Sequence, residues 1–201
     1  MAIVSATGLG LRTRRGWVFR DVTLAVEPGE LLALTGPAGS GRSSLLLALA
    51  GHFRTTTGGH ELTGRAGIGY VPGLNEPERG LTAAEHVRER LLLLGQRPRG
   101  RGVFANRVTE LLADLPLDEA TLGRDLTPYQ RQRLMLRLAE LPHGAGEPAL
   151  IVADDVDAGL DTAERAWLWR SLEDLAEQGR AVVVTCREPA GKATEYPMEN
   201  R

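Results

Sequence analysis

A glycine-rich stretch decides the predicted fold, and it reads Gly36-Pro37-Ala38-Gly39-Ser40-Gly41-Arg42-Ser43-Ser44. Two glycines separated by four residues, then a basic residue and a hydroxyl, form the pattern of a phosphate-binding loop, with arginine where lysine is usual. An apolar strand-like run at residues 31–35 leads in, and an apolar helical run at residues 42–50 leads out. Glycines let backbone N–H groups curl around a phosphate, and the helix start adds further donors. The stretch therefore predicts a phosphate-binding loop rather than a ligand-free turn between strand and helix.

Length and composition indicate a single globular domain. The chain has 201 residues, of which 42% are hydrophobic and 25% charged, which is ordinary for a soluble protein with a buried core. Its net charge of -2 gives no sign of a nucleic-acid-binding surface, so we expect no nucleic-acid partner. The single cysteine, Cys186, excludes an internal disulfide and a zinc site built from cysteines. The sequence contains neither a signal peptide nor a membrane span, which predicts a cytosolic protein.

Strand-like and helical stretches alternate along the chain, which predicts an α/β fold. The expected strands are residues 18–26, 31–35, 68–71, 149–153 and 181–185, and the expected helices are residues 42–50, 82–94, 103–115, 128–141 and 162–178. The last two strands are continuously apolar, as is typical of strands buried on both faces of a parallel sheet. Three of the helices lie between about residues 73 and 141, so we expect a helix-rich insertion there.

A second motif for nucleotide chemistry is the apolar strand Leu150-Ile151-Val152-Ala153 followed by Asp154 and Asp155. Carboxylates at the carboxyl end of a strand in such a sheet lie beside the phosphate loop. There the first aspartate can hold Mg²⁺ and the second can orient an attacking water. A pair of aspartates alone is usually a solvated loop start. Together with a phosphate loop more than a hundred residues upstream, it favours a nucleotide site.

Further segments extend this pattern along the chain. They are Arg20-Asp21-Val22-Thr23-Leu24 with Glu27-Pro28-Gly29-Glu30, then Ile68-Gly69-Tyr70-Val71-Pro72, Leu81-Thr82-Ala83-Ala84-Glu85, Leu126-Thr127-Pro128-Tyr129-Gln130-Arg131-Gln132-Arg133, Asp154-Asp155-Val156-Asp157-Ala158-Gly159-Leu160-Asp161 and Val182-Val183-Val184-Thr185. Taken in order, they resemble the nucleotide-binding domain of ATP-binding cassette (ABC) transporters over about residues 3–187. The collinear set is far more specific than any one of its motifs.

The resemblance implies a fold and a domain organisation. It implies a P-loop NTPase core with a mostly parallel sheet, antiparallel strands near the N-terminus and an inserted helical subdomain. The whole chain, residues 1–201, would be one nucleotide-binding domain. Its RecA-like core would comprise about residues 1–72 and 142–201, and the helical subdomain about residues 73–141.

The resemblance also implies roles for individual residues. ATP would bind with Mg²⁺ at residues 36–44, where Arg42 and the loop N–H groups hold the phosphates. Ser43 and Asp154 would serve the magnesium ion, and Asp155 would be the nearest group to a general base. Asp161 would contact a second nucleotide-binding subunit in a face-to-face dimer.

Several positions depart from the family pattern. Arg42 replaces the lysine of the phosphate loop, and Gly73 replaces the glutamine of the glutamine loop. Asp155 replaces glutamate and is one methylene shorter, and a misplacement of about 1 Å can cost on the order of 100-fold in rate. Cys186 stands at the switch histidine, where a neutral thiol cannot bridge to the γ-phosphate. The aromatic residue that stacks on adenine is missing, and Trp17 is the nearest substitute.

The signature segment is altered as well. Thr127 keeps a hydroxyl, and Gln130 completes a capping box with it, so a helix should still begin here. Pro128 suits the first helical position but removes one N–H donor, and Tyr129 places a ring where glycine permits close approach. The segment therefore predicts a helix with a compromised anion site, or a capped helix without any ligand role.

The resemblance implies an ATP-binding subunit that acts on a separate transmembrane permease, docked beside residues 73–90 at the inner face of the cell membrane. The altered positions favour weak or absent hydrolysis. One alternative is a non-hydrolysing regulatory or structural partner of an intact cassette subunit. A cassette ATPase of translation or DNA repair is less favoured, because the chain has neither a tandem cassette nor coiled-coil heptads. Both a homodimer and a heterodimer remain open, as do the substrate and the direction of transport.

Overall fold

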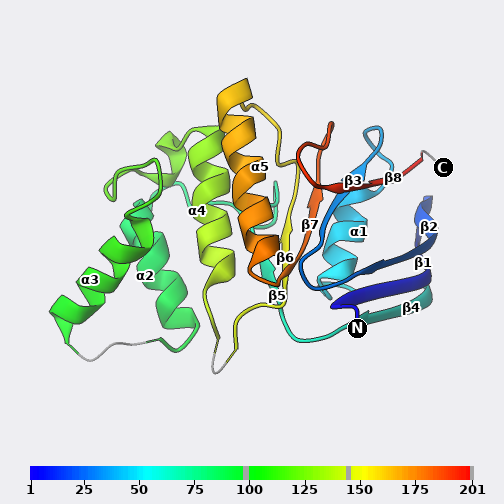
Figure 1. The fold of residues 1–201 in the computed structure, drawn as a ribbon, viewed down its shortest axis with the longest axis horizontal. Helices are drawn as coiled ribbons and strands as arrows, with labels where there is room; N and C mark the ends of the chain where they lie inside the picture. Colours follow the sequence, from blue (N-terminus) through cyan, green and yellow to red (C-terminus); the bar gives the residue numbers. More distant parts are fainter. Residues whose placement is uncertain (97–99, 144–145, 200–201) are drawn as a thin grey trace.

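A computed structural model describes residues 1–96, 100–143 and 146–199. The elements in chain order are β1 (Val4–Thr13), β2 (Gly16–Val26), β3 (Leu31–Thr35), α1 (Arg42–Leu49), β4 (Thr57–Leu62), β5 (Ala66–Ile68), α2 (Ala83–Leu93), α3 (Arg101–Leu112), the short 3₁₀ helix η1 (Gly123–Asp125), α4 (Pro128–Glu140), β6 (Leu150–Ala153), α5 (Thr162–Glu177), β7 (Ala181–Thr185) and β8 (Thr194–Pro197). All five expected helices are present, so the α/β prediction is confirmed (Figure 1).

A parallel sheet with the strand order β5-β6-β7-β3-β8 forms the centre of the molecule. Its register pairs Leu31 with Val182 and Leu150 with Ala181. Every residue of β3, β6 and β7 is buried, which agrees with their continuously apolar sequences. Because the strands run in one direction, their carboxyl ends meet at one edge, where the following loops converge.

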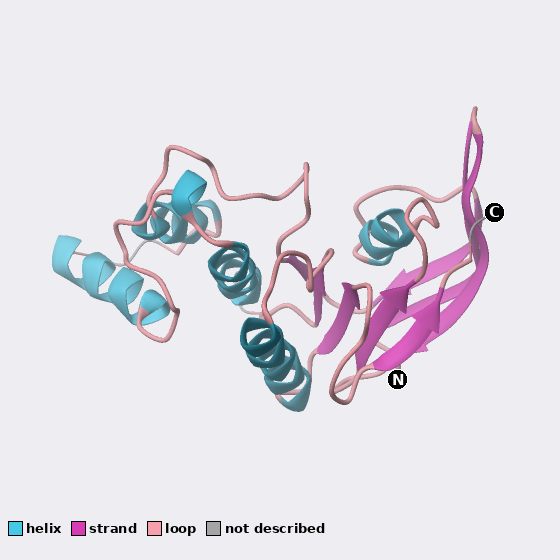
Figure 2. Cartoon of the chain, turned by 90° about the horizontal axis from the view of Figure 1, so that it is seen from above, coloured by secondary structure: helices cyan, strands magenta, loops and turns pink. Residues whose placement is uncertain are grey.

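Alternate residues of these strands pack on opposite faces of the sheet. Leu32 and Leu34 join a core with α1, whereas Leu31 and Ala33 join a core with α5 and part of α4. This is the two-residue period of a strand covered on both sides. Figure 2 shows α1 on one side of the sheet and the longer helices on the other.

A second sheet, antiparallel with the order β2-β1-β4, covers the outer side of α1. Val4 of β1 pairs with Val26 of β2 on one side and with Leu62 of β4 on the other. The expected N-terminal antiparallel strands are therefore confirmed, and β2 matches the expected strand at residues 18–26. The sequence did not indicate β1 and β4 separately, because glycines interrupt both and β4 is mostly exposed.

The helices α2 and α3 lie at the end of the molecule away from the antiparallel sheet (Figure 1). With part of α4 and the segments between them, they form an apolar cluster of their own, which includes Val87, Val108, Leu134 and Leu138. The remaining buried face of α4 contributes Tyr129 and other residues to the core under α5. The division into a core and a helical subdomain at about residues 73–141 stays a prediction, which this separate cluster supports.

Helix starts follow the capping signals in the sequence. Thr82, Thr127 and Asp161 each accept a hydrogen bond from the backbone N–H three residues on, and the side chain of that residue reaches back. The N–H donor to Thr127 Oγ1 lies at 3.2 Å, and that to Asp161 Oδ1 at 2.8 Å. Such caps satisfy backbone donors that a helix leaves unpaired at its start.

One predicted strand needs correction, and one further strand was not predicted. The strand expected at residues 68–71 ends earlier, because β5 stops at Ile68. The Asn75 side-chain amide donates to the carbonyls of Ile68 and Gly69, at 2.9 and 2.7 Å, while single backbone bonds to the β6 segment continue from Gly69 and Tyr70. The edge strand β8, which pairs with β3, carried no sequence signal because its residues are mostly polar and exposed.

Two tryptophans on α5 provide a test of this packing. Trp169 is 3% exposed in the core, whereas Trp167 is 55% exposed and contacts Tyr129. We expect Trp169→Ala to lower the free energy of unfolding by about 3–5 kcal/mol, as large-to-small core changes do. Trp167→Ala should cost less than about 1.5 kcal/mol, the upper range for an aromatic pair. Urea unfolding followed by circular dichroism measures both, and equal losses would contradict the burial.

Candidate functional site

A cavity of about 760 Å³ lies where the loops after β3, β5, β6 and β7 converge. This is the edge of a parallel sheet at which ligands usually bind. Residues that line it include Pro37, Ala38, Gly39, Arg42, Ser43, Gly73, Asp154, Asp155, Thr185 and Arg187. The structure thus brings the glycine-rich loop, both aspartates and Thr185, the residue before Cys186, to one place.

The glycine-rich loop has a backbone that only glycine accommodates well. Gly36, Gly39 and Gly41 have positive φ angles of 135°, 86° and 90°. A Cβ on Gly41 would lie 2.4 Å from the Val18 carbonyl oxygen, so the loop also packs closely against β2. The side chain of Ser40 is buried, and its hydroxyl has no partner among the described residues. The loop therefore has the compact form that its sequence predicts.

Arg42 is the first residue of α1, and its guanidinium crosses to the end of β7. Its Nη1 donates a hydrogen bond of 2.6 Å to the Cys186 carbonyl. A guanidinium has five N–H donors on three nitrogens, so others stay available to a phosphate in the cavity. Arginine in place of lysine thus both holds the loop after β7 and contributes positive charge to the site.

Thr185 joins the two aspartates at the end of β6. Its hydroxyl donates to Asp154 Oδ1 and accepts the backbone N–H of Asp155, at 2.7 Å. Asp154 itself is 5% exposed and lines the cavity together with Ser43. The predicted magnesium ligands therefore face the same space. The sequence analysis gave Thr185 no role of its own. Its place at the carboxyl end of an apolar strand was nevertheless a signal that it lies at the ligand-binding edge of the sheet.

Asp155 has an unusual backbone, with a φ of 48°. Aspartate enters this left-handed region more readily than most residues, because its short side chain can bond locally. Gln132 of α4 is 2% exposed, and its side-chain amide lies 3.3 Å from the Asp154 carbonyl and 3.4 Å from that of Asp155. The position of Asp155 is thus held from β7 and from α4. The sequence analysis missed Gln132, because this contact joins residues far apart in the chain.

The Cys186 thiol points into the protein and not into the cavity. Its side chain is 0% exposed and belongs to the core formed with α5, and Cys186 is not among the described residues that line the cavity. Burial raises the pKa of the thiol to about 12, and the negative charge of Asp157 adds to this effect. At the switch position, the backbone carbonyl of Cys186 therefore accepts a hydrogen bond from Arg42, whereas its thiol is buried and neutral.

The signature segment is a well-formed helix start. Thr127 and Gln130 cap α4, and the Gln130 amide also donates 2.7 Å to the Pro116 carbonyl. Tyr129 is 7% exposed, and its ring centroid lies 6.2 Å from that of Trp167. Its ring therefore lies in the core, whereas the sequence suggested a ring at the place where glycine permits close approach. None of residues 127–130 is among the described residues that line the cavity.

Two other predicted positions have local structural partners. Asp161 is exposed, and its carboxylate caps α5. The Trp17 ring lies beneath Arg12, whose guanidinium carbon is 5.6 Å from the ring centroid. Trp17 is not among the described cavity-lining residues, so it offers no platform in the cavity for a base.

Comparison with known proteins identifies the family. The sequence model of the ABC transporter family matches residues 19–155. The zinc import ATP-binding protein ZnuC of Jannaschia sp. is 31% identical, over 94% of this chain and 74% of that protein. The hemin import ATP-binding protein HmuV of Gloeobacter violaceus is 28% identical, over 92% of this chain and 73% of that protein. The chain belongs to the ABC transporter family. It is an ATP-binding subunit.

Solved structures agree with this fold. A dimeric bacterial ABC transporter cassette superposes with a TM-score of 0.80 at 21% identity, covering 98% of this chain and 94% of that one. A dimeric ATP-binding cassette with ADP and Pi gives a TM-score of 0.76 at 22% identity, covering 92% of this chain and 88% of that one. The predicted P-loop NTPase fold is confirmed. Within the described residues, no helix has both the length and the apolar character that a membrane crossing needs.

The buried thiol yields a prediction about alkaline pH. An unfolded chain loses the cysteine proton near pH 8.5, whereas the folded chain keeps it to about pH 12. Between these values the unfolded state binds fewer protons, so the free energy of unfolding falls as pH rises, by at most about 1.4 kcal/mol per unit from this group. We expect Cys186→Ala to lose stability less steeply than the unchanged chain in urea titrations across this range.

Iodoacetamide labelling checks the same burial directly. At about pH 8 the folded chain should label far more slowly than the urea-unfolded chain, because the thiolate reacts and the thiol does not. Equally fast labelling of both states would show that Cys186 is exposed.

Proposed function

We propose that this subunit binds ATP with Mg²⁺ in the cavity at residues 36–44 and serves an importer. The observation that carries the proposal is the cavity itself, which gathers Arg42, Ser43, Asp154 and Asp155. The relatives ZnuC and HmuV are named as import proteins, which supports import. Their cargoes differ, so the cargo is a property of the permease rather than of this chain.

Each group in the cavity has a distinct role in this proposal. The loop N–H groups and the free N–H groups of Arg42 hold the phosphates. The Ser43 hydroxyl and the Asp154 carboxylate suit Mg²⁺, which prefers oxygen ligands. When bound, the ion offsets the negative charge of the phosphates. Thr185 positions Asp154, because its hydroxyl donates a hydrogen bond to Oδ1 of that carboxylate.

We propose that hydrolysis by this chain alone is negligible. Asp155 is short and is held by backbone contacts to Thr185 and Gln132, so it has little freedom to approach a water. The buried thiol of Cys186 supplies no imidazole. At the signature, Pro128 has no N–H, and the Gln130 N–H is used by Thr127. A rate on the order of a hundredfold or more below an ordinary cassette follows from these changes.

The subunit acts in a face-to-face dimer, in which each nucleotide lies between one phosphate loop and the other subunit's signature. In a homodimer, both sites would combine all the altered groups. With an intact cassette as partner, one site would keep the partner's phosphate loop, glutamate and histidine opposite residues 127–130 of this chain. Residual hydrolysis would then occur at that site. The buried Cys186 favours this arrangement, in which the chain is a non-hydrolysing partner.

The partner in the membrane is a separate permease, which docks beside residues 73–90. The subunit is therefore peripheral, at the inner face of the cell membrane. We further propose that the core and the helical subdomain divide at about residues 73 and 141.

Calorimetric titration with MgATP tests the binding site. We expect Arg42→Ala to weaken binding by about tenfold to a hundredfold, since a charged hydrogen bond contributes about 1.5–3 kcal/mol. Asp154→Asn should bind ATP equally with and without Mg²⁺. The control is Arg54→Ala, an exposed arginine that does not line the cavity, and it should bind as the unchanged chain does. No heat from the unchanged chain at millimolar MgATP would overturn the proposal.

Steady-state phosphate release tests the proposal of negligible hydrolysis. The purified chain should release phosphate no faster than Asp155→Asn, which serves as the blank. A rate of about 1 per second or faster, within the usual range for enzymes, that this substitution abolishes would show that Asp155 suffices as a base.

A further inference from the structure

Arg187 follows Cys186 and lines the nucleotide cavity, but the function proposed above gives it no role. Its side chain is exposed, and in the described parts of the chain its guanidinium forms neither an ion pair nor a hydrogen bond. A guanidinium carries a permanent positive charge, and its planar fork of N–H donors matches the oxygens of a phosphate. Arg187 is therefore a free cationic group in the cavity that the phosphate loop forms.

The backbone at Arg187 is fixed by its neighbours. The Asp157 carboxylate accepts the backbone N–H of Arg187, at 2.9 and 3.1 Å, and that of Glu188, at 3.2 Å. Arg165 of α5 forms an ion pair of 3.1 Å with Glu188. Because these contacts use the backbone of Arg187 and the side chain of Glu188, they hold the loop in place and leave the Arg187 guanidinium free. A charge placed in advance in this way binds a ligand with little reorganisation.

Two contacts connect the loop of Arg187 with groups that serve the outer phosphates of ATP. Arg42 donates a hydrogen bond of 2.6 Å to the carbonyl of Cys186, the residue before Arg187. The basic residue of a phosphate loop reaches the β- and γ-phosphates. Thr185 donates to Asp154, a proposed ligand of Mg²⁺, and this ion bridges β- and γ-phosphate oxygens. Arg187 therefore lies at the end of the cavity that suits the terminal phosphate.

The charge of the cavity also requires Arg187. The charged residues of the described lining are two arginines, Arg42 and Arg187, and two aspartates, Asp154 and Asp155, so their formal charges cancel. Without Arg187 the negative groups would outnumber the positive ones and would oppose a ligand that is itself negative. The Arg187 guanidinium thus offsets a charge that Arg42 alone does not.

Resting on the function proposed above, we propose that Arg187 binds the γ-phosphate of MgATP, so that this chain distinguishes ATP from ADP with an arginine. The guanidinium donates to γ-phosphate oxygens from the backbone position that Asp157 holds. ADP lacks this phosphate, so Arg187 stabilises the complex with ATP and not the complex with ADP.

Calorimetry with two nucleotide probes tests the inference. The probes are MgADP and the Mg²⁺ complex of adenylyl imidodiphosphate, an ATP analogue whose β–γ bridge resists hydrolysis. We expect Arg187→Ala to weaken binding of the analogue by about tenfold or more, because a charge-assisted hydrogen bond is lost, and to leave MgADP binding nearly unchanged. An equal loss for both nucleotides, or no loss for either, would overturn the inference.

Two further variants keep the test independent of folding. Arg187→Lys keeps a positive charge and should retain part of the preference for the analogue, whereas Arg187→Gln keeps a long side chain without the charge and should lose it. The backbone bonds to Asp157 remain in all three variants, so their urea unfolding midpoints should match that of the unchanged chain. Equal preference in the lysine and glutamine variants would show that the charge at this position has no role.

Matched controls identify the phosphate that is bound. Arg54→Ala removes an exposed arginine that does not line the cavity, and this variant should bind both probes as the unchanged chain does. Arg42→Ala should weaken both probes, because both contain the β-phosphate that the basic residue of the loop reaches.

The outcomes separate this inference from the proposed function. If the unchanged chain binds neither probe, the proposed function fails, and the role of Arg187 fails with it. If the unchanged chain binds both probes and Arg187→Ala keeps the same ratio of the two affinities, only the inference about Arg187 fails.

Discussion

The parallel pairing of β3, β6 and β7 is the constraint on which the nucleotide site depends. The three strands are buried on both faces, so their side chains fix the register from two sides. Pairing of Ala153 with Val184 and of Leu34 with Thr185 brings the carboxyl ends of the three strands to one level. A slip of one residue would turn every core side chain to the opposite face and would separate Asp154 from Thr185.

The parts of the site that sequence alone predicted are those with local signals. The glycine-rich loop requires positive φ angles, and the phosphate loop upstream makes the two aspartates after the buried strand a signal for a nucleotide site. Thr185, Gln132 and the bond from Arg42 to the Cys186 carbonyl escaped prediction. Each joins segments more than twenty residues apart, and its partner is decided by the register of the sheet or the placement of α4. The strands β1, β4 and β8 were not predicted for a related reason. They form by pairing with neighbouring strands, and their own sequences have no continuous apolar pattern.

The altered positions support one another physically. With its thiol in the core, Cys186 leaves its carbonyl directed at Arg42, and the guanidinium has a second nitrogen to make that bond. A lysine would have to serve the carbonyl and a phosphate with one nitrogen. Aspartate at position 155 fits the left-handed backbone there better than glutamate does. The departures from the family pattern therefore form a consistent arrangement rather than isolated defects.

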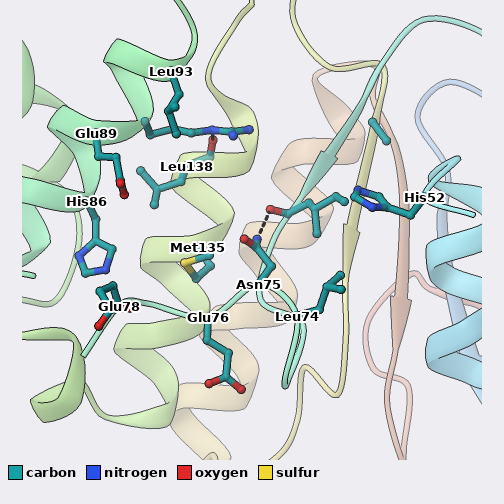
Figure 3. A pocket seen from close by; sticks show the side chains of 13 residues that line it. His52, Leu74, Asn75, Glu76, Glu78, His86, Glu89, Leu93, Met135 and Leu138 are labelled. Atoms are coloured by element: carbon teal, nitrogen blue, oxygen red, sulfur yellow. Dashed lines mark hydrogen bonds between the residues drawn. The ribbon is translucent and has the colours of Figure 1, made fainter. Parts of the chain in front are cut away.

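A second cavity, of about 520 Å³ (Figure 3), is lined by α2, by α4 and by the segment after β5, which also lines the nucleotide cavity. Gln132 reaches the backbone after β6, while Met135 and Leu138, at helical spacing, line the second cavity. Leu74 lines both cavities, and it follows Gly73, which has a φ of 73° and no side chain to carry a contact. The segment after β5 and the helix α4 therefore both connect the nucleotide cavity with the second cavity. Gln132 donates to the backbone carbonyls of both aspartates, so α4 is connected to the nucleotide site although none of its described residues lines that cavity.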